Sequence, residues 1–426
     1  GDNTGMNVHE QVKIQDFISG SVFSGSRATL LGVGPVTEAT VEAAFSTASR
    51  TSSPPIFIAS RNQVDIREFG GGYLMGGMDQ YSFAELIRQK QEEIGYNGPV
   101  FICRDHGGPW QRNAELDNAY PVEKALEIAR ESFKHDILAG FNYLHIDPTK
   151  CPHQFSMEDL IDWTVQLEQY CEEVRNNAGI QKLEYEVGAE DIQGGLTEPT
   201  SFERFLSLLT EKLKELSLPL PTCIVGQTGT LVRMDRNVGR FDRELTAQLV
   251  QLAHSYGMGF KEHNGDYLSG ATCRIHPGLG IDAMNVAPEF GVIETDALLH
   301  LSDLEDKLIR EGWVPSEQGS RFREILQRKT FEQAPWKKWM TDDIKKLETS
   351  EIRDDTYLRL LIARVSGHYV LPDPEVRKAQ DTMLATIDSY ELLDLSAAEY
   401  VREQVTRRMV FYVDHFQARG INERLT

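Results

Sequence analysis

Short apolar runs alternate with longer amphipathic segments between residue 28 and residue 310, and nearly every short run ends in a polar residue. Eight of these runs have the length and composition of buried strands: 29–34, 56–60, 100–104, 143–147, 183–189, 223–226, 259–263 and 282–286. Helical patterns lie between most of them, for example at 82–94, 123–135, 157–173, 201–216 and 244–255. Because parallel strands need crossover helices, this order predicts an α/β fold, a (β/α)8 barrel.

A doubly wound open sheet is the main competing fold, since it uses the same order of strands and helices. The polar residues at the strand ends favour the barrel, because barrel active sites lie at the carboxyl ends of the strands. One connection departs from the pattern. The segment 264–280, NGDYLSGATCRIHPGLG, shows no obvious helix, and we expect an irregular loop there that could form a lid or a phosphate cradle.

The character of the sequence changes beyond about residue 316, where helical patterns replace the alternation. An apolar-periodic run covers 357–369, and the segment Leu-Pro-Asp-Pro at 371–374 then ends it, because proline cannot continue a helix. We therefore predict three parts. They are an N-terminal extension at 1–27, the barrel with the active site at 28–315, and a C-terminal helical appendage at 316–426.

Composition limits the partners of the chain. Its formal charge of −21 at pH 7 provides no basic field to attract nucleic acid or anionic lipid. The five cysteines are odd in number and show no CxxC spacing, which predicts reduced thiols in a cytoplasmic protein. There is no apolar run of about 18 residues, so we expect no transmembrane helix. The polar start, GDNTGMNVHEQ, does not have the pattern of a signal peptide.

One predicted strand end, FICRDHGGPW at 101–110, carries the clearest chemical motif. Asp105 and His106 would point to opposite faces of a regular strand, but both can reach one pocket where the strand rolls into the Gly-Gly-Pro turn. A carboxylate beside a metal-binding imidazole suits metal-dependent aldol chemistry. We predict that Asp105 transfers protons and that His106 binds a metal. The alternative for Asp105 is a helix cap or a partner of Arg104.

A second histidine, His263, ends the seventh predicted strand beside Glu262. A single histidine is more often a capping or core residue, but two in equivalent positions favour a divalent metal such as Zn, Mn, Co or Mg. His145 is either a neighbour of this centre or a packed residue. His276 is a weaker candidate because it lies in the segment expected to be irregular.

Three more strand ends carry groups that could act in catalysis. Asp147 lies two residues after His145, so both face the same side of the strand, although the proline that follows Asp147 is also typical of a turn. Glu190 is predicted to be a metal ligand or a second acid/base, with a solvated loop acid as the alternative. Lys261 could form a Schiff base, a hypothesis that we rank below the metal centre.

Polar residues after the second predicted strand are candidates for substrate binding, because a guanidinium and amides can hydrogen-bond sugar hydroxyls or an anion. Residues near the later strand ends extend this set. The full set of predicted substrate-binding residues is Ser60, Arg61, Asn62, Gln63, Lys261, Asp266, Arg274 and Asn285.

Taken in order, these motifs resemble those of a known family. They are Ser60-Arg61-Asn62-Gln63-Val64, Gly71-Gly72-Tyr73, Asp105-His106-Gly107-Gly108-Pro109, His145-Ile146-Asp147, Gly188-Ala189-Glu190 and His263-Asn264-Gly265-Asp266-Tyr267. The chain looks like the accessory, "non-catalytic" subunit of class II tagatose-bisphosphate aldolase, the GatZ/KbaZ-like group. The resemblance spans most of the chain and includes Arg364 and Tyr369.

The resemblance implies a barrel related to class II aldolases. In those enzymes an Asp-His pair supplies an acid/base and a metal ligand, which would fall on Asp105 and His106. A later strand-end histidine, matching His263, would be a second ligand. Some relatives of the group are metal-dependent ketose or ketose-phosphate epimerases.

The chain departs from class II aldolases at 224–229, Ile-Val-Gly-Gln-Thr-Gly, where a histidine ligand would be expected. Gln227 or Glu190 would then have to complete the metal shell. The sequence has no GxxxxGK[ST] loop, so it gives no support to a kinase activity.

These observations lead us to expect a metal-dependent sugar epimerase that acts on a ketose or ketose phosphate. It would form an enediolate by retro-aldol and aldol steps at C4 or by deprotonation at C3. One alternative is a non-catalytic partner that stabilises a class II aldolase subunit, and another is a stand-alone class II aldolase. The expected partners are a sugar or sugar phosphate and either a further copy of the chain or an aldolase subunit.

Overall fold

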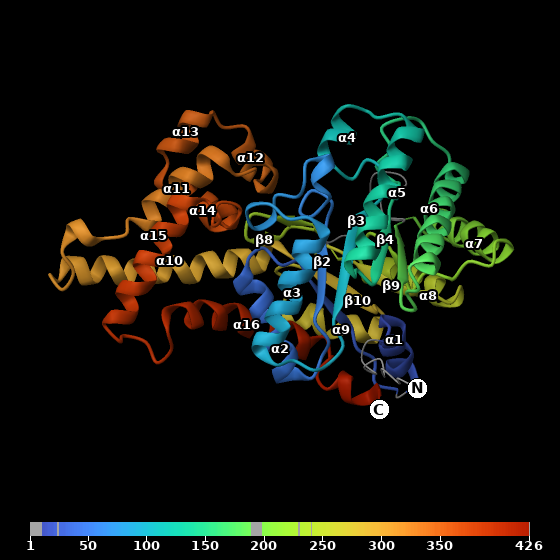
Figure 1. Cartoon of the computed structure of the whole chain (residues 1–426), viewed down its shortest axis with the longest axis horizontal. Helices are drawn as coiled ribbons and strands as arrows, with labels where there is room; N and C mark the ends of the chain where they lie inside the picture. Colours follow the sequence, from blue (N-terminus) through green and yellow to red (C-terminus); the bar gives the residue numbers. More distant parts are fainter. Residues whose placement is uncertain (1–10, 24, 189–197, 229–230, 240, 426) are drawn as a thin grey trace.

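Eight parallel strands close into a barrel in the computed structural model, which describes residues 11–23, 25–188, 198–228, 231–239 and 241–425 (Figure 1). The strands are β1 (Leu30–Val33), β2 (Ile56–Ala59), β3 (Phe101–Gly107), β4 (Tyr143–Ile146), β5 (Glu184–Gly188), β6 (Cys223–Val225), β9 (Gly259–Glu262) and β10 (Ala283–Val286). Because β10 pairs with β1, the sheet has no open edge. The predicted barrel is confirmed, and each predicted strand overlaps an observed one.

A long helix follows each strand of the barrel. These helices are α2 (Glu38–Thr51), α3 (Gln80–Ile94), α5 (Val122–Ala139), α6 (Met157–Asn177), α7 (Pro199–Glu215), α8 (Arg243–Ser255), α9 (Gly270–Leu279) and α10 (Pro288–Arg310). Shorter elements lie in the connections: η2 (Arg67–Phe69), η3 (Leu74–Gly76), α4 (Asn113–Asp117), β7 (Val232–Arg233) and β8 (Arg236–Asn237). Among the described residues, no helix combines the length and the apolar character of a membrane span.

The expectation of an irregular loop between the seventh and eighth barrel strands is wrong, because α9 lies there. Ser269 caps this helix by accepting a hydrogen bond from the backbone N–H of Thr272. Its amphipathic pattern is short, and Pro277 interrupts it inside the last turn. Glycine at the start and proline near the end are both unfavourable inside helices, so the sequence pattern concealed the helix.

Local sequence explains where several helices begin. The side chains of Thr37, Asp79 and Ser156 each accept a hydrogen bond from the backbone N–H of the residue three positions later. The side chain of that later residue accepts a hydrogen bond from the backbone N–H of the capping residue, which completes a capping box. Gly95 ends α3 in the left-handed conformation that glycine adopts most readily. These caps fix the points at which the chain leaves the strands and enters the outer layer.

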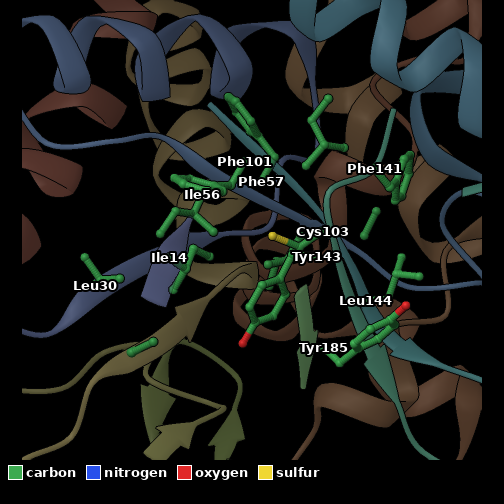
Figure 2. Close-up of a cluster of buried hydrophobic side chains, with 14 of the residues drawn as sticks. Ile14, Leu30, Ile56, Phe57, Phe101, Cys103, Phe141, Tyr143, Leu144 and Tyr185 are labelled. Atoms are coloured by element: carbon green, nitrogen blue, oxygen red, sulfur yellow. The ribbon is translucent and has the colours of Figure 1, made fainter. Parts of the chain in front are cut away.

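The barrel core consists of buried aromatic and aliphatic side chains between the strands and the helices. Figure 2 shows Phe57, Phe101 and Leu144 in this cluster. Burying a side chain of this size stabilises the fold by roughly 1.5–3 kcal/mol. The helix α1 (Ile14–Phe23) joins the same core, and the Glu184 carboxylate accepts hydrogen bonds from the backbone N–H of Ile14 at 2.8 Å.

The C-terminal elements are η4 (Ser316–Gln318), α11 (Phe322–Gln333), η5 (Trp336–Trp339), α12 (Asp342–Lys345), α13 (Thr349–Asp354), α14 (Thr356–Ser366), η6 (Gly367–Tyr369), α15 (Pro374–Ser389), α16 (Ala397–His415) and η7 (Ile421–Leu425). Figure 1 shows α10 reaching out from the barrel beneath α11–α14 and crossed by α15, while α16 returns towards α2. Two hydrophobic clusters lie in this region, apart from the barrel core. Met409 of α16 belongs to the barrel core, and the predicted boundary at residue 316 stays a prediction.

Candidate metal centre at the barrel mouth

Three imidazoles meet at the carboxyl ends of β3, β4 and β9. The ring centroids of His106 and His263 lie 4.6 Å apart, those of His106 and His145 5.0 Å apart, and those of His145 and His263 5.5 Å apart. The His145 Nδ1 accepts a hydrogen bond of 3.1 Å from the backbone N–H of His106. The barrel therefore brings together histidines that are far apart in the sequence, since His106 and His263 are 157 positions apart.

A bulge in β3 explains how adjacent residues face one site. The register with β4 shifts between Arg104 and Gly107, and His106 has a φ of 44°. Such a bulge re-aims side chains that would otherwise alternate between faces. Gly107 is needed at its end, because a Cβ there would lie 2.7 Å from the backbone oxygen of His145. Asp105 and His106 thereby both reach the barrel mouth, as the sequence led us to expect.

Three carboxylates surround the imidazoles. An Asp147 oxygen lies 3.0 Å from the His106 Nδ1, and an Asp105 oxygen lies 3.8 Å from the His263 Nε2. The Glu186 Oε2 lies 3.5 Å from the same His263 nitrogen and 3.4 Å from the His145 Nδ1. These residues form three overlapping groups whose potential ligand atoms lie within 4.8 Å of one another: Asp105-His106-His263, His106-His145-Asp147 and His145-Glu186-His263.

The histidines keep the two aspartates ionised. Burial raises the pKa of Asp105, but the charges of His106 and His263 outweigh burial and hold that pKa well below its usual range. Burial likewise raises the pKa of Asp147, while the hydrogen bond from His106 and the charge of His145 lower it below the ordinary value. Both aspartates are therefore available as anions at neutral pH.

The donor set fits a divalent transition metal, because imidazole and carboxylate are the ligands that such ions take. The Glu186 Oε2 and the His145 Nε2 are buried and lack a hydrogen-bond partner within the described residues. A buried polar atom without a partner costs roughly 1–3 kcal/mol, and coordination to an ion would offset that cost. Neither residue was predicted as a ligand from the sequence.

Lys261 lies below this centre, inside the barrel. Its Nζ is 3.0 Å from the Glu186 Oε1, to which the Tyr143 hydroxyl donates a hydrogen bond of 2.8 Å. Burial lowers the pKa of Lys261, but the charge of Glu186 more than compensates, so the pKa is raised and the amine stays protonated. A protonated, buried amine is a poor nucleophile, which argues against the Schiff-base hypothesis. Lys261 is buried and is not among the residues that line the cavity beside Asp105, so its role in substrate binding stays a prediction.

A cavity of about 200 Å³ opens beside the centre, and Asp105 lies in its wall. Ser60 and Gln63, two of the predicted substrate-binding residues, also line it. Asn285 adjoins it, with its Nδ2 3.4 Å from an Asp105 oxygen. Asn62 is half-buried and binds Asn113 instead: its Nδ2 donates a hydrogen bond of 3.3 Å to the Asn113 Oδ1, and its Oδ1 accepts one of 3.1 Å from the Asn113 backbone N–H.

Arg61 is not placed to bind a substrate, in contrast to its predicted role. The side chain is fully buried, and its guanidinium lies 2.9 Å from Asp65 and 2.7 Å from Glu115. It also donates a hydrogen bond of 2.9 Å to the carbonyl oxygen of Gly108. Arg61 therefore ties the loop after β2 to the loop after β3, and its bidentate capacity is used within the protein.

Asp266 and Arg274 also lie away from the predicted substrate position. The buried Asp266 carboxyl accepts hydrogen bonds from the backbone N–H of Ala287 at 3.0 Å and of Glu289 at 2.8 Å, at the start of α10. Burial, followed by the charge of Glu289, raises the pKa of Asp266 to about 8. Asp266 thus caps a helix. Arg274 is an exposed side chain of α9.

Two predicted metal ligands are not part of these groups. Glu190 lies outside the described residues. Gln227 is half-buried just after β6, and the ligand groups found within the described residues do not include it. The position of Glu186 could have been inferred from strand periodicity, because Glu184 and Glu186 are two residues apart and share one face of the strand. Glu186 is nearer the carboxyl end of that strand and therefore nearer the barrel mouth.

The fold and the site together define a (β/α)8 barrel with a histidine and carboxylate centre at its C-terminal mouth. The chain belongs to the D-tagatose-1,6-bisphosphate aldolase subunit GatZ/KbaZ-like family, whose model matches residues 18–418. No curated protein matches it in sequence.

Solved structures share the fold at low sequence identity. A probable tagatose 6 phosphate kinase from Sinorhizobium meliloti 1021 is 18% identical with a TM-score of 0.70, covering 91% of this chain and 100% of its own. The fructuronate-tagaturonate epimerase UxaE from Cohnella laeviribosi is 12% identical with a TM-score of 0.55, covering 92% and 81%. The YdjI aldolase from Escherichia coli K12 is 12% identical with a TM-score of 0.50, covering 96% and 98%.

Proposed function

We propose that the protein is a metal-dependent sugar epimerase that acts on a ketose or ketose phosphate. The observation that carries this proposal is the position of Asp105, which belongs to the histidine centre and also lines the cavity. A proton-transfer group must lie within reach of both the substrate and the group that stabilises developing charge. Asp105 is placed for both.

We assign the metal to His106 and His263, with His145 and Glu186 as further donors. This assignment is supported by the short distances between their ligand atoms and by the unpartnered atoms of His145 and Glu186. A bound divalent ion supplies a Lewis acid that polarises a ketose carbonyl. Gln227 and Glu190 stay proposals from the sequence alone.

Asp147 is better suited to positioning than to proton transfer. Its carboxylate accepts a hydrogen bond of 3.0 Å from the backbone N–H of Thr149 and lies against the His106 Nδ1. A carboxylate at one ring nitrogen fixes the tautomer and the orientation of an imidazole, so that the other nitrogen can bind a metal. We therefore propose that Asp147 orients His106.

At C4, Asp105 would take the proton of the C4 hydroxyl as the C3–C4 bond breaks. The bond electrons pass to the ketone and give an enediolate, and C4 becomes an aldehyde. Re-addition to the other face of the aldehyde, with return of the proton from Asp105, inverts C4. At C3, Asp105 would instead remove the carbon-bound proton, and a second acid on the opposite face, for which the sequence suggests Glu190, would return it.

Two other functions remain candidates. The family description names an aldolase subunit, which favours a partner that stabilises a separate aldolase. A stand-alone class II aldolase would use the same residues but release the aldehyde. The three functions differ in whether the chain turns over substrate alone and in whether the fragments escape.

An NMR assay of the purified chain against a panel of ketoses and ketose phosphates, with and without chelator, tests the proposal. We expect a new epimer whose formation stops when the chelator removes the metal. Release of an aldehyde would replace the proposal with an aldolase. If no substrate turns over, and the chain forms a tight complex with a class II aldolase subunit, the partner function is correct.

A further inference from the structure

The C-terminal helical region forms one wall of the cavity beside Asp105. The turns η5 and η6 supply Lys338, Trp339, His368 and Tyr369, opposite residues from the ends of the barrel strands. The volume of about 200 Å³ is below the roughly 300–1,000 Å³ of typical drug-sized pockets, so the cavity suits one small molecule. A ligand that reaches Asp105 would therefore also approach this wall.

The charges in the cavity wall are few and well separated in the sequence. Among the lining residues, Lys338 is the one lysine or arginine and Asp105 is the one carboxylate. Within the part of the chain that the structure describes, no ion pair involves Lys338, although the chain carries a net charge of −21. Its ammonium instead lies 5.0 Å from the ring centroid of Trp339 and 5.4 Å from that of Tyr369.

The rings around Lys338 are held in place by each other. The Trp339 indole N–H donates a hydrogen bond of 3.3 Å to the Tyr369 hydroxyl, and the rings of Tyr369 and Tyr73 lie 5.5 Å apart. Aromatic faces attract the ammonium and limit its movement without neutralising its charge. The Lys338 ammonium is therefore left to pair with an anionic ligand.

His368, which also lines the cavity, provides an independent observation. The residue is 6% exposed, and its Nδ1 has no hydrogen-bond partner within the described residues. Burial and then the charge of Lys338 lower the pKa of His368 to about 3, so its ring is neutral. Buried polar atoms normally have partners, so this neutral ring has hydrogen-bonding capacity that the described residues do not use. Its Nδ1 lies beside Gly291 of α10, where an added Cβ would be 2.7 Å away.

We propose that Lys338 determines substrate specificity by binding an anionic group, a phosphate or a carboxylate, at the end of the substrate remote from Asp105. His368 and Tyr369 supply further polar groups to the same subsite. This subsite rests on the proposed function, because that function places the reacting carbons of the substrate at Asp105. Hydrogen bonds between an ammonium and an anion are roughly twice as strong as neutral ones, so this contact favours an anionic sugar over its neutral counterpart.

Equilibrium binding of unreactive polyols tests the subsite without requiring turnover. The probes are a six-carbon polyol, the same polyol with a terminal phosphate, and a six-carbon aldonate, measured by calorimetry against the protein as purified. We expect at least one anionic probe to bind about tenfold or more tightly than the neutral polyol. Tighter binding of the polyol phosphate would identify a phosphate as the preferred group, and tighter binding of the aldonate would identify a carboxylate.

Three variants assign this preference to Lys338. Lys338→Met should remove the tenfold preference for the anionic probe, and Lys338→Arg should retain most of it. Lys337→Met is the matched control, because Lys337 is the neighbouring exposed lysine, lies 5.7 Å from the Trp336 ring and does not line the cavity. It should keep the wild-type preference.

The outcomes distinguish failure of the proposed anion subsite from failure of the proposed epimerase function. If the wild type binds no anionic probe more tightly, or if Lys338→Met keeps the preference, the subsite is overturned whatever the turnover. If Lys338→Met removes the preference but no ketose turns over, the subsite stands and the proposed epimerase fails. Comparable melting temperatures for the four proteins exclude unfolding as the cause.

Discussion

At the scale of the residue, charge state is determined by what surrounds each buried side chain. Asp105 and Asp147 have histidines beside them and stay ionised, whereas Glu168 of α6 is 1% exposed and its carboxyl oxygens have no hydrogen-bond partner among the described residues. Burial, followed by the charge of Glu172, raises the pKa of Glu168 to about 9. Glu168 is therefore a neutral acid in the folded protein.

Glu168 should make the protein less stable as the pH rises. In the unfolded chain a glutamate loses its proton above about pH 4, but folded Glu168 keeps its proton up to about pH 9. The folded state binds more protons in this window, so the free energy of unfolding falls by up to about 1.4 kcal/mol per pH unit from this group.

Glu168→Gln removes this ionisation. Between pH 6 and pH 8, the free energy of unfolding of the variant, measured by urea denaturation, should fall less steeply than that of the wild type by about 1 kcal/mol per pH unit. Glu203→Gln, at an exposed position of α7, is the control. Parallel pH profiles for Glu168→Gln and the wild type would contradict this account.

At the scale of the element, the buried guanidinium of Arg61 joins the loops after β2 and β3. It pairs with Asp65 within its own loop, and it reaches Glu115 and the carbonyl oxygen of Gly108 beyond β3. The same loop after β3 contains the turn that follows Asp105 and His106. Holding the two loops together therefore also holds the approach to the candidate metal centre.

Arg61→Met should destabilise the fold, because it leaves the buried Glu115 without its cation and leaves Asp65 with the Arg112 guanidinium at 3.5 Å. The loss expected for breaking such a pair is about 3–5 kcal/mol, measured as the free energy of unfolding. Arg67→Met is the matched control. Arg67 pairs with Asp79 at 3.2 Å but its side chain is 75% exposed, so its loss should cost at most about 1 kcal/mol. A stable Arg61→Met with weaker substrate binding would instead support the role predicted from the sequence.

The sequence predicted the parts of the site that lie at strand ends. Asp105, His106 and His263 follow apolar runs, where the carboxyl ends of barrel strands must converge. His145 and Glu186 lie within strands, and their inward direction depends on the barrel's register. Arg61 and Asp266 have the residue types of sugar ligands, but contacts with residues distant in the sequence use Arg61 for an ion pair with Glu115 and Asp266 for a helix cap.

At the scale of the whole molecule, two regions distant in sequence form one cavity. The barrel contributes Asp105, which also belongs to the candidate metal centre, and the C-terminal helical region contributes Lys338 and its aromatic neighbours. The sequence predicted a helical region after the barrel but not its position over the mouth. That position depends on contacts such as the ion pairs of Arg364 with Asp296 and Asp235, which no local pattern reveals.

The central claim is that Asp105 transfers protons beside a metal in an epimerase. The most direct test compares the wild type with Asp105→Asn, using metal analysis and NMR detection of products from ketoses and their phosphates. Asp162→Asn, at an exposed position of α6, is the control. We predict that Asp105→Asn keeps its metal but loses about 100-fold or more of the epimerase rate. Full activity of Asp105→Asn with the metal still bound would contradict the account.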